Sequence, residues 1–231
     1  MNEFGLSIAR SGYQGYKYKH KFGSNPSLNN TTKESIWTAG GLYPWGDLTS
    51  ADTVFIVSSS ASDTAQLVLE GLDANYLPHV ETITLTGTSP VESTSEFIRL
   101  DRASYNDGAN VGNITASFGA TDGPTISYIA AGDNQTLLGI YTVPADKVGY
   151  LIGYTASVGK NDDAEVDLYI RQGGTSSFQI ASEVRIAETT HHQDFCVPLK
   201  LAPKTDIDFR AIASNTGSKC IVSFDVILER L

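Results

Sequence analysis

Runs of alternating apolar and polar residues follow one another along most of this chain. In residues 165–171, for example, Val166, Leu168 and Ile170 alternate with polar or charged residues, and successive side chains of a β-strand point to opposite faces. Turn-forming sequences such as Asn106-Asp107-Gly108 separate these runs. The pattern predicts strands at 53–58, 66–70, 80–86, 97–102, 114–118, 125–130, 137–143, 149–158, 165–171, 178–186, 194–201, 207–213 and 220–228.

The spacing of these strands predicts the fold class. Short strands at intervals of about 8–15 residues, with turn signals between them, are typical of an antiparallel sandwich or barrel. No segment has the apolar spacing of an α-helix of ordinary length. We therefore predict an all-β protein, an antiparallel β-sandwich of the jelly-roll type. A soft boundary near residue 132 divides it into two β halves, 51–132 and 133–231, which can share a core.

The first 50 residues do not follow this pattern. Residues 1–33 show no helical or strand period, and we predict that they form an extended arm. Residues 31–37 form the one candidate helical turn, with Thr31 or Thr32 as its N-cap. Two tryptophans and a tyrosine then fall within nine residues. We interpret this aromatic segment as a plug that covers one end of the sandwich, because such rings bury a large apolar area.

Charge separates the arm from the body. Residues 1–33 hold five basic residues and one acid, a net charge of +4, whereas residues 34–231 hold 11 basic and 25 acidic residues, a net charge of −14. A basic, aromatic arm before an acidic body indicates docking onto a partner. The predicted docking residues of arm and plug are Lys17, Tyr18, Lys19, Lys21, Phe22, Trp37, Tyr43 and Trp45.

Composition narrows the classes of partner and compartment. The acidic body disfavours nucleic-acid binding, because contact with phosphates needs a positive face. No apolar run approaches the ~18 residues of a membrane span, and the first residues lack a signal-peptide pattern. We therefore expect synthesis in a cytoplasm without export. Cys196 and Cys220 lie in predicted strands, where we expect two small buried side chains rather than a disulfide.

Candidate chemistry is sparse. His192, Asp194 and Cys196 alternate along one predicted strand and offer zinc ligands, but no paired spacing supports a zinc site. Asp162, Asp163 and Glu165 gather at a hairpin tip without the spacing of a calcium loop. We expect solvated polar residues in both places and predict no cofactor, no metal and no catalytic site. A Ser-His-Asp triad stays open, because its members need not be close in sequence.

Several segments resemble a family of tailed-bacteriophage virion structural proteins. The similar segments follow the family's order along the chain, at 21–26, 36–45, 58–65, 70–76, 81–87, 135–137, 141–144 and 204–210. The resemblance implies a non-enzymatic component of the virion, located on the head exterior, the neck or the tail. It transfers no functional residue, because these segments are turns and strands.

We therefore hypothesise an accessory virion protein, assembled in the host cytoplasm, that docks by its arm to a capsid, portal, neck or tail protein. It would decorate the capsid or attach at the neck as a homo-oligomer, with a trimer as the first expectation. On this hypothesis, deletion of residues 1–30 leaves the body folded but abolishes incorporation into particles. One alternative is a receptor- or glycan-binding module of a tail fibre or spike, with a groove formed by Tyr105, Tyr128 and Phe178. A second is a cell-wall hydrolase with a carboxylate pair in a cleft.

Overall fold

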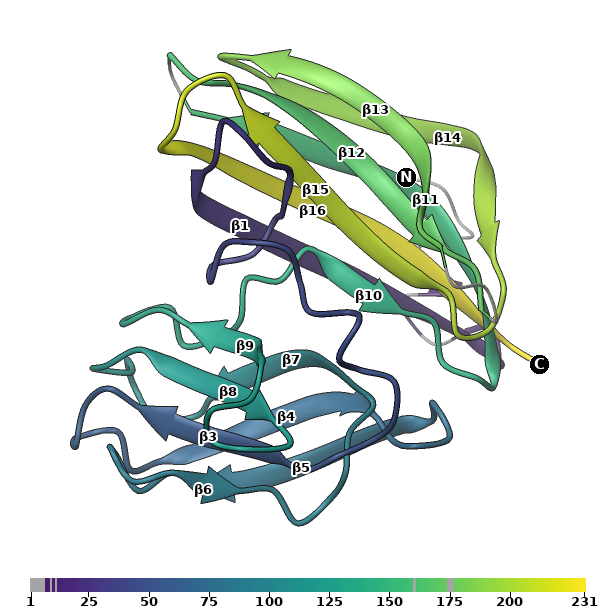
Figure 1. Cartoon of the computed structure of the whole chain (residues 1–231). Helices are drawn as coiled ribbons and strands as arrows, with labels where there is room; N and C mark the ends of the chain where they lie inside the picture. Colours follow the sequence, from purple (N-terminus) through teal and green to yellow (C-terminus); the bar gives the residue numbers. More distant parts are fainter. Residues whose placement is uncertain (1–6, 9, 11, 160, 174–176) are drawn as a thin grey trace.

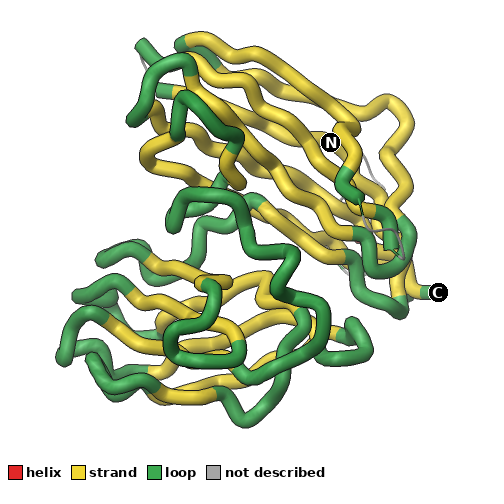
Figure 2. Tube along the Cα trace, in the orientation of Figure 1, coloured by secondary structure: helices red, strands yellow, loops and turns green. Residues whose placement is uncertain are grey.

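The computed structural model describes residues 7–8, 10, 12–159, 161–173 and 177–231. Its element order contains β-strands and no α-helix, and every pairing between strands is antiparallel. The prediction of an all-β, antiparallel protein is therefore confirmed. The strands fall into two lobes, which loops connect (Figures 1 and 2).

The first lobe contains two small sheets formed by the middle of the chain. One sheet has the order β6-β3-β8-β9 and the other the order β5-β4-β7. Their buried side chains, including Leu67, Leu69, Leu100 and Ile114, form one core. The strands of this lobe are β3 (Val54–Ser58), β4 (Gln66–Leu72), β5 (Pro78–Thr84), β6 (Val91–Glu92), β7 (Arg99–Tyr105), β8 (Ile114–Phe118) and β9 (Thr125–Ile129).

The second lobe contains two longer sheets. One has the order β1-β16-β11-β14, and the other has the order β10-β15-β12-β13, with β2 added beside β15. The strands of this lobe are β1 (Tyr16–Leu28), β2 (Glu34–Ser35), β10 (Ile140–Thr142), β11 (Lys147–Val158), β12 (Asp163–Arg171), β13 (Gln179–Ala187), β14 (Thr190–Leu201), β15 (Asp206–Ala213) and β16 (Ser218–Arg230).

The core of the second lobe lies between its two sheets, which form two layers in Figure 1. Phe209 of β15 meets Tyr154 of β11 and Phe224 of β16, with ring centroids 5.1 and 5.0 Å apart. All three rings are buried. Since β15 belongs to one sheet and β11 and β16 to the other, these contacts bind the layers together.

The largest departure from the prediction concerns the N-terminal arm. Residues 16–28 form β1, an edge strand of the second lobe that pairs with β16 from Tyr16↔Glu229 to Leu28↔Ser218. The prediction of an extended arm is therefore wrong for these residues, because they form the edge strand of a sheet in their own chain. The first lobe lies in the connection between β1 and β10, two strands of the second lobe. The preceding residues 1–6, 9 and 11 lie outside the described part.

The predicted helical turn at residues 31–37 is also wrong. Glu34 and Ser35 form β2, which pairs with Ala211 and Arg210 of β15. The carboxylate of Glu34 accepts hydrogen bonds from the backbone N–H groups of Asn29 and Gly41. The side chain of Glu34 thus gives these backbone N–H groups an acceptor while the chain stays extended, which removes the need for helical hydrogen bonds here.

The two cysteines have different environments. Cys220 is buried in β16, as predicted, but Cys196 in β14 is exposed. The register between β11 and β14 passes from Leu151↔Leu199 directly to Gly153↔Asp194, so residues 195–198 bulge out of the sheet. This bulge exposes Cys196 and corrects the prediction that it is buried. Both thiols are free.

Candidate functional site at the junction of the two lobes

An aromatic ladder occupies the junction between the lobes. The ring centroids of Trp37 and Tyr43 lie 5.3 Å apart, and those of Tyr43 and Trp45 lie 4.9 Å apart. All three side chains are buried and belong to the core of the first lobe. The indole N–H of Trp45 also donates a 2.9 Å hydrogen bond to Asp208 of β15, in the second lobe. The aromatic segment is therefore packed between two lobes, not at the end of a sandwich.

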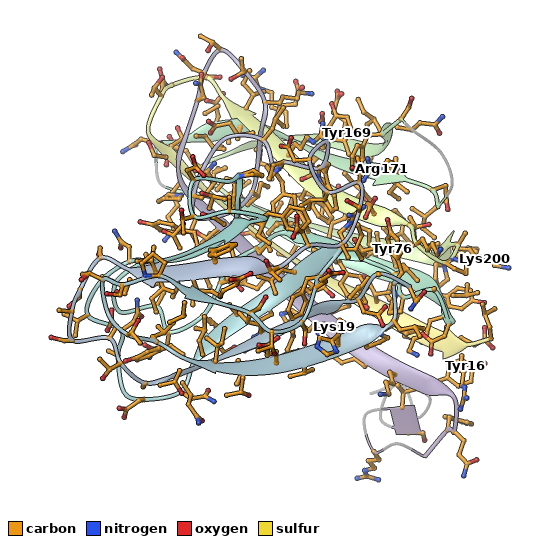
Figure 3. The ribbon with its side chains drawn as sticks, turned by 60° about the horizontal axis from the view of Figure 1, so that its bottom comes forward. Tyr16, Lys19, Tyr76, Tyr169, Arg171 and Lys200 are labelled. Carbon is orange, nitrogen blue, oxygen red and sulfur yellow. The ribbon has the colours of Figure 1, made fainter. Side chains whose placement is uncertain are left out.

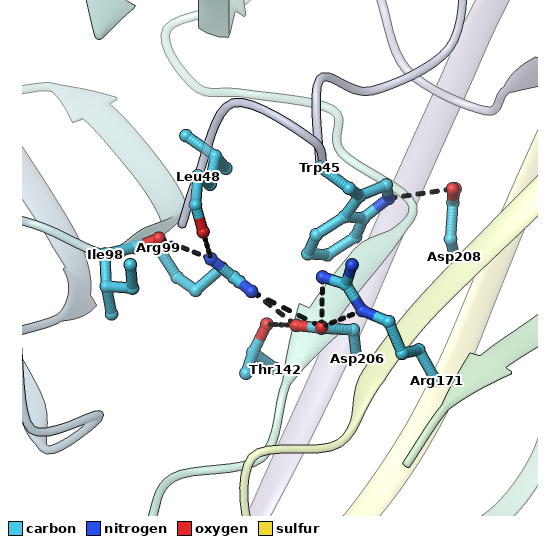
Figure 4. Close-up of polar contacts among 8 residues, drawn as sticks. All are labelled: Trp45, Leu48, Ile98, Arg99, Thr142, Arg171, Asp206 and Asp208. Atoms are coloured by element: carbon cyan, nitrogen blue, oxygen red, sulfur yellow. Dashed lines mark hydrogen bonds and ion pairs between the residues drawn. The ribbon is translucent and has the colours of Figure 1, made fainter. Parts of the chain in front are cut away.

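A buried carboxylate, Asp206, joins two arginines across this junction (Figure 4). Arg99 of the first lobe donates from Nε to Oδ1 of Asp206 over 3.1 Å. Arg171 of the second lobe donates from Nη2 and Nε to Oδ2 over 2.6 and 2.8 Å. The hydroxyl of Thr142 donates to the same carboxylate over 2.6 Å. Charge-assisted bonds of this kind are the stronger ones in proteins.

The two terminal nitrogens of Arg99 have separate partners, and Nη2 donates to Oδ2 of Asp206 over 3.4 Å. Its Nη1 group donates to the carbonyl oxygens of Leu48 and Ile98 over 2.9 and 2.7 Å. The Arg99 side chain is only 4% exposed. One arginine of the first lobe thus connects the aromatic segment, β7 and β15, and its buried charge has a matching carboxylate.

Stacked cations and rings continue from the junction along the second lobe. The guanidinium carbon of Arg171 lies 5.4 Å from the ring centre of Trp45 and 4.7 Å from that of Phe178. The guanidinium carbon of Arg210 lies 4.8 Å from Phe178 and 4.3 Å from Tyr169. Such contacts are attractive through the quadrupole of the ring. They attach the loop that carries Phe178 to the sheet beneath it.

A fully buried lysine forms a second link between the lobes. Lys21 of β1 donates a hydrogen bond from Nζ to the backbone carbonyl of Asp101 in β7. Burial lowers the pKa of Lys21 to about 8, although the charge of Asp101 acts in the opposite direction. Burial also raises the pKa of the Asp101 carboxyl, again against the effect of Lys21. Both shifts show that the charges at this contact have lost much of their solvation.

The lowered pKa of Lys21 leads to a pH-dependent stability. The pKa of this amine is about 8 in the folded chain, against an ordinary value of 10.5, so between these values the unfolded chain binds more protons. Stability rises with pH in that range. We expect the free energy of unfolding to increase by about 2 kcal/mol from pH 8 to pH 10, relative to a Lys21→Met variant. Urea denaturation across this range measures the difference.

The matched control for this measurement is Lys17→Met, on the same strand but exposed. Its stability is expected to follow that of the wild-type chain across the whole pH range. Parallel curves for wild type and Lys21→Met would show that Lys21 does not titrate in this range.

The predicted docking residues divide into two groups. Lys21, Trp37, Tyr43 and Trp45 are buried within the chain, which corrects the prediction that they face a partner. Lys17, Tyr18, Lys19 and Phe22 lie on β1 and keep access to solvent, with Tyr18 51% and Phe22 39% exposed. Lys17, Tyr18 and Lys19 border a groove of about 170 Å³ between β1 and the first lobe.

The groove is crossed by an ion pair between the lobes. Nζ of Lys19 lies 3.5 Å from Oε2 of Glu70 in β4, and Figure 3 shows Lys19 beside the first lobe. Lys19 and Lys21 are thus on the side of β1 that faces the first lobe. Tyr18 and Phe22 alternate with them on the opposite face of β1. Tyr18 still borders this groove, and Phe22 borders a second one with Arg102 of the first lobe.

No local pattern predicts that Arg99 and Arg171 share one carboxylate or that Lys21 meets Asp101. Asp206, Asp208 and Arg210 alternate along one strand, a pattern that is typical of an exposed face with cross-strand pairs. The structure covers that face with the aromatic segment, so both aspartates are buried. The closely spaced rings at 37–45 were the only available signal, since they require an apolar surface to pack against.

The metal candidates do not come together. Among the described residues, the group with three candidate ligand atoms close enough for one ion is Glu165, Asp167 and Glu183. The ammonium group of Lys33 binds there already, since it contacts both Glu165 and Asp167. The predicted zinc candidates His192, Asp194 and Cys196 are not such a group, although Nε2 of His192 lies 3.0 Å from Oδ1 of Asp194. Asp163 of the hairpin tip instead pairs with Arg185.

The residues named for the two alternative functions are dispersed. Tyr105 is buried in the core of the first lobe, Tyr128 lies in β9, and Phe178 packs between two arginines in the second lobe. Burial raises the pKa of Asp208, but this carboxylate lies beneath Trp45 rather than in a cleft. Among the described residues, no helix is long and apolar enough to cross a membrane.

Comparisons with known proteins add no family. No protein-family model matches the chain, and no curated protein sequence matches it. Among solved structures, the infectious bursal disease virus VP2 subviral particle aligns with a TM-score of 0.24 and 8% identity, covering 100% of this chain and 78% of that chain. The structure of the Gt strain of that virus gives 0.19 and 8%, with 100% and 83% covered. Its T=1 particles give 0.20 and 10%, with 100% and 80% covered. Overlaps this low do not establish a shared fold.

Proposed function

We propose that this protein is a non-enzymatic structural component of a tailed-phage virion. The observation that carries the proposal is the junction, where buried charged and aromatic side chains hold two lobes together. A buried carboxylate shared by two arginines and a lysine buried between strands maintain one geometry. Residues used in this way serve architecture, and a fixed two-lobed shape suits a repeated building block.

The strand order of the second lobe supports a more specific fold. Without β2, this lobe has eight strands, and their numbers in chain order give 1-8-3-6 for one sheet and 2-7-4-5 for the other. This is the order of a jelly roll, in which two Greek keys wrap eight strands into two facing sheets. The first lobe is then an insertion between the first and second strands of the roll. Fold alone does not assign a function, so the assignment to a virion also draws on the sequence resemblance.

Docking to the particle then involves the exposed side of β1. Tyr18 and Phe22 are exposed on this face of β1, where the hydroxyl of Tyr18 donates a hydrogen bond to Asp225 of β16 and Phe22 pairs with Ser223. Aromatic side chains at exposed positions are common at the centres of interfaces. We propose this face as the contact with a capsid, portal, neck or tail protein of the particle.

The test is whether the chain sediments with particles. Antibodies against the purified protein are used to probe particles purified from cultures that produce the chain naturally. We expect the chain in the particle fraction, with gold label at one position of the virion. A Tyr18→Ser/Phe22→Ser variant is expected to lose at least 90% of this incorporation. A Val80→Ser/Val111→Ser variant, which changes two exposed residues of the first lobe, is expected to retain it. A chain found only in the soluble fraction would contradict the proposal.

A further inference from the structure

Strand β13 forms a free edge of the second lobe. It ends the sheet β10-β15-β12-β13 and pairs only with β12 among the described strands. Its register with β12 is continuous from Ser182↔Leu168 to Ala187↔Asp163. An edge strand presents a row of backbone N–H and C=O groups that can pair with another strand.

The other long edge on this side of the lobe is protected. Strand β14 contains Pro198, and residues 195–198 bulge out of its sheet. Proline and bulges are the usual devices that prevent edge strands from pairing. The segment 182–187 of β13 has neither device. This segment is therefore the one open to pairing on this margin.

Two opposite charges lie near the middle of β13. Glu183 and Arg185 share a face of the sheet, beside Asp167 and Glu165 of β12. Lys33 contacts Glu165 and Asp167, whereas no described ion pair includes Glu183. Arg185 bonds to Asp163 but keeps a side chain that is 65% exposed. An excess of negative charge around Glu183 would therefore be relieved by a cation from outside the chain.

The register of a symmetric pair is restricted by these charges. Two identical strands that pair antiparallel are related by a two-fold axis perpendicular to the sheet. Side chains that lie opposite each other share a face of the sheet, so this axis must lie level with a residue and not between two residues. An axis through Glu183 or Arg185 places like charges opposite each other, which is unfavourable. An axis through Val184 places Glu183 of each copy opposite Arg185 of the other.

We propose that β13 pairs antiparallel with β13 of a second copy of this chain, about a two-fold axis through Val184. The result is a continuous sheet across both copies and two ion pairs between Glu183 and Arg185. Such an interface is closed after two copies. It therefore specifies a dimer and not the trimer that was the first expectation from the sequence.

The surroundings of β13 fit this occupant. Ile180 is 51% exposed and Val197 is 82% exposed on the margin formed by β13 and β14. Val184 and Phe195 are only partly buried against the core there. In Figure 1 this margin lies on the side of the second lobe farthest from the first lobe, so the first lobes of two copies would point away from each other. A second copy would cover apolar surface without a clash between first lobes.

Charge reversal tests the proposal on the purified full-length chain by sedimentation equilibrium. The wild-type mass is expected to be twice 24.8 kDa. Glu183→Arg places arginine opposite arginine and is expected to weaken the dimer at least 100-fold, giving a monomer. Arg185→Glu is expected to do the same, and the double variant with both changes is expected to restore the dimer. Lys200→Glu, an exposed reversal on β14, is the control and is expected to stay dimeric.

A disulfide tests the position of the axis. In a Cys196→Ser background, Val184→Cys is expected to form a cross-link between copies on oxidation, since residues opposite each other have Cβ atoms about 4.5–5.5 Å apart. Glu183→Cys is expected to form none, since its opposite residue is Arg185. A monomeric wild type, or a dimer unaffected by either single reversal, would overturn the proposal.

The dimer describes how the proposed virion component associates with itself, so this inference rests on the proposed function. The two experiments nevertheless test them separately. If the chain sediments with particles while the purified protein is monomeric, the pairing is wrong and the virion assignment stands. If the charge swap behaves as expected but the chain is absent from particles, the pairing stands and the assignment is wrong.

Discussion

Deletion of residues 1–28 is expected to leave the second lobe unable to fold. This segment includes all of β1, which covers one edge of β16 along Tyr16–Leu28 and places Leu28 in the core. It also removes Lys21, which links β1 to Asp101 of the first lobe. We expect a loss larger than the 5–15 kcal/mol that stabilises a typical domain. Circular dichroism and the soluble yield would measure it. The structure therefore reverses the expectation that the body folds without its first 30 residues.

A peptide rescue separates loss of a strand from other effects of truncation. A synthetic peptide of residues 13–30, added during refolding, is expected to restore a folded second lobe, because an added strand can complete an open sheet edge. A peptide with Lys21 and Leu28 replaced by aspartate is the control and is expected to fail. A truncated chain that folds without any peptide would show that β1 is dispensable.

Replacement of Asp206 by leucine is expected to cost about 3–5 kcal/mol, the range for removing one member of a buried ion pair. Arg99 and Arg171 would keep their charges in the junction without the carboxylate that each contacts. Thr142 would also lose its acceptor. Because the network joins the lobes, we expect Asp206→Leu to unfold in two separate urea transitions. The wild-type chain is expected to unfold in one.

Two comparisons test this explanation. An Arg99→Met/Arg171→Met/Asp206→Leu variant removes every charge of the cluster and is expected to recover most of the lost stability, since apolar replacement of a whole buried network is often neutral. Asp225→Asn, on the exposed side of the sheet, is expected to change stability by less than about 1 kcal/mol, although Asp225 contacts Tyr18 and His20. Equal costs for Asp206→Leu and Asp225→Asn would rule out a stabilising role for the junction.

Local sequence was sufficient for most strands because each has one face toward a core. The apolar residues Val166, Leu168 and Ile170 of β12 are buried as the alternation required. Strand β1 was missed, although residues 17–22 also alternate. Its lysines point toward the first lobe and its aromatic residues point outward. Lysines that alternate with aromatic residues also have the two-residue period of a β-strand, so the sequence contained a signal for β1.

The sequence by itself determined the all-β class, the turns and most of the strands, because these follow from the alternation of neighbouring residues. It also indicated that the rings of 37–45 need an apolar partner. Only the tertiary structure decided what they pack against, and that residues 16–28 pair with β16, the last strand of the chain. Contacts such as Lys21 with Asp101 and Arg99 with Asp206 join residues 80 and 107 positions apart. Their charges are buried only because two lobes meet there, and no local pattern encodes that meeting.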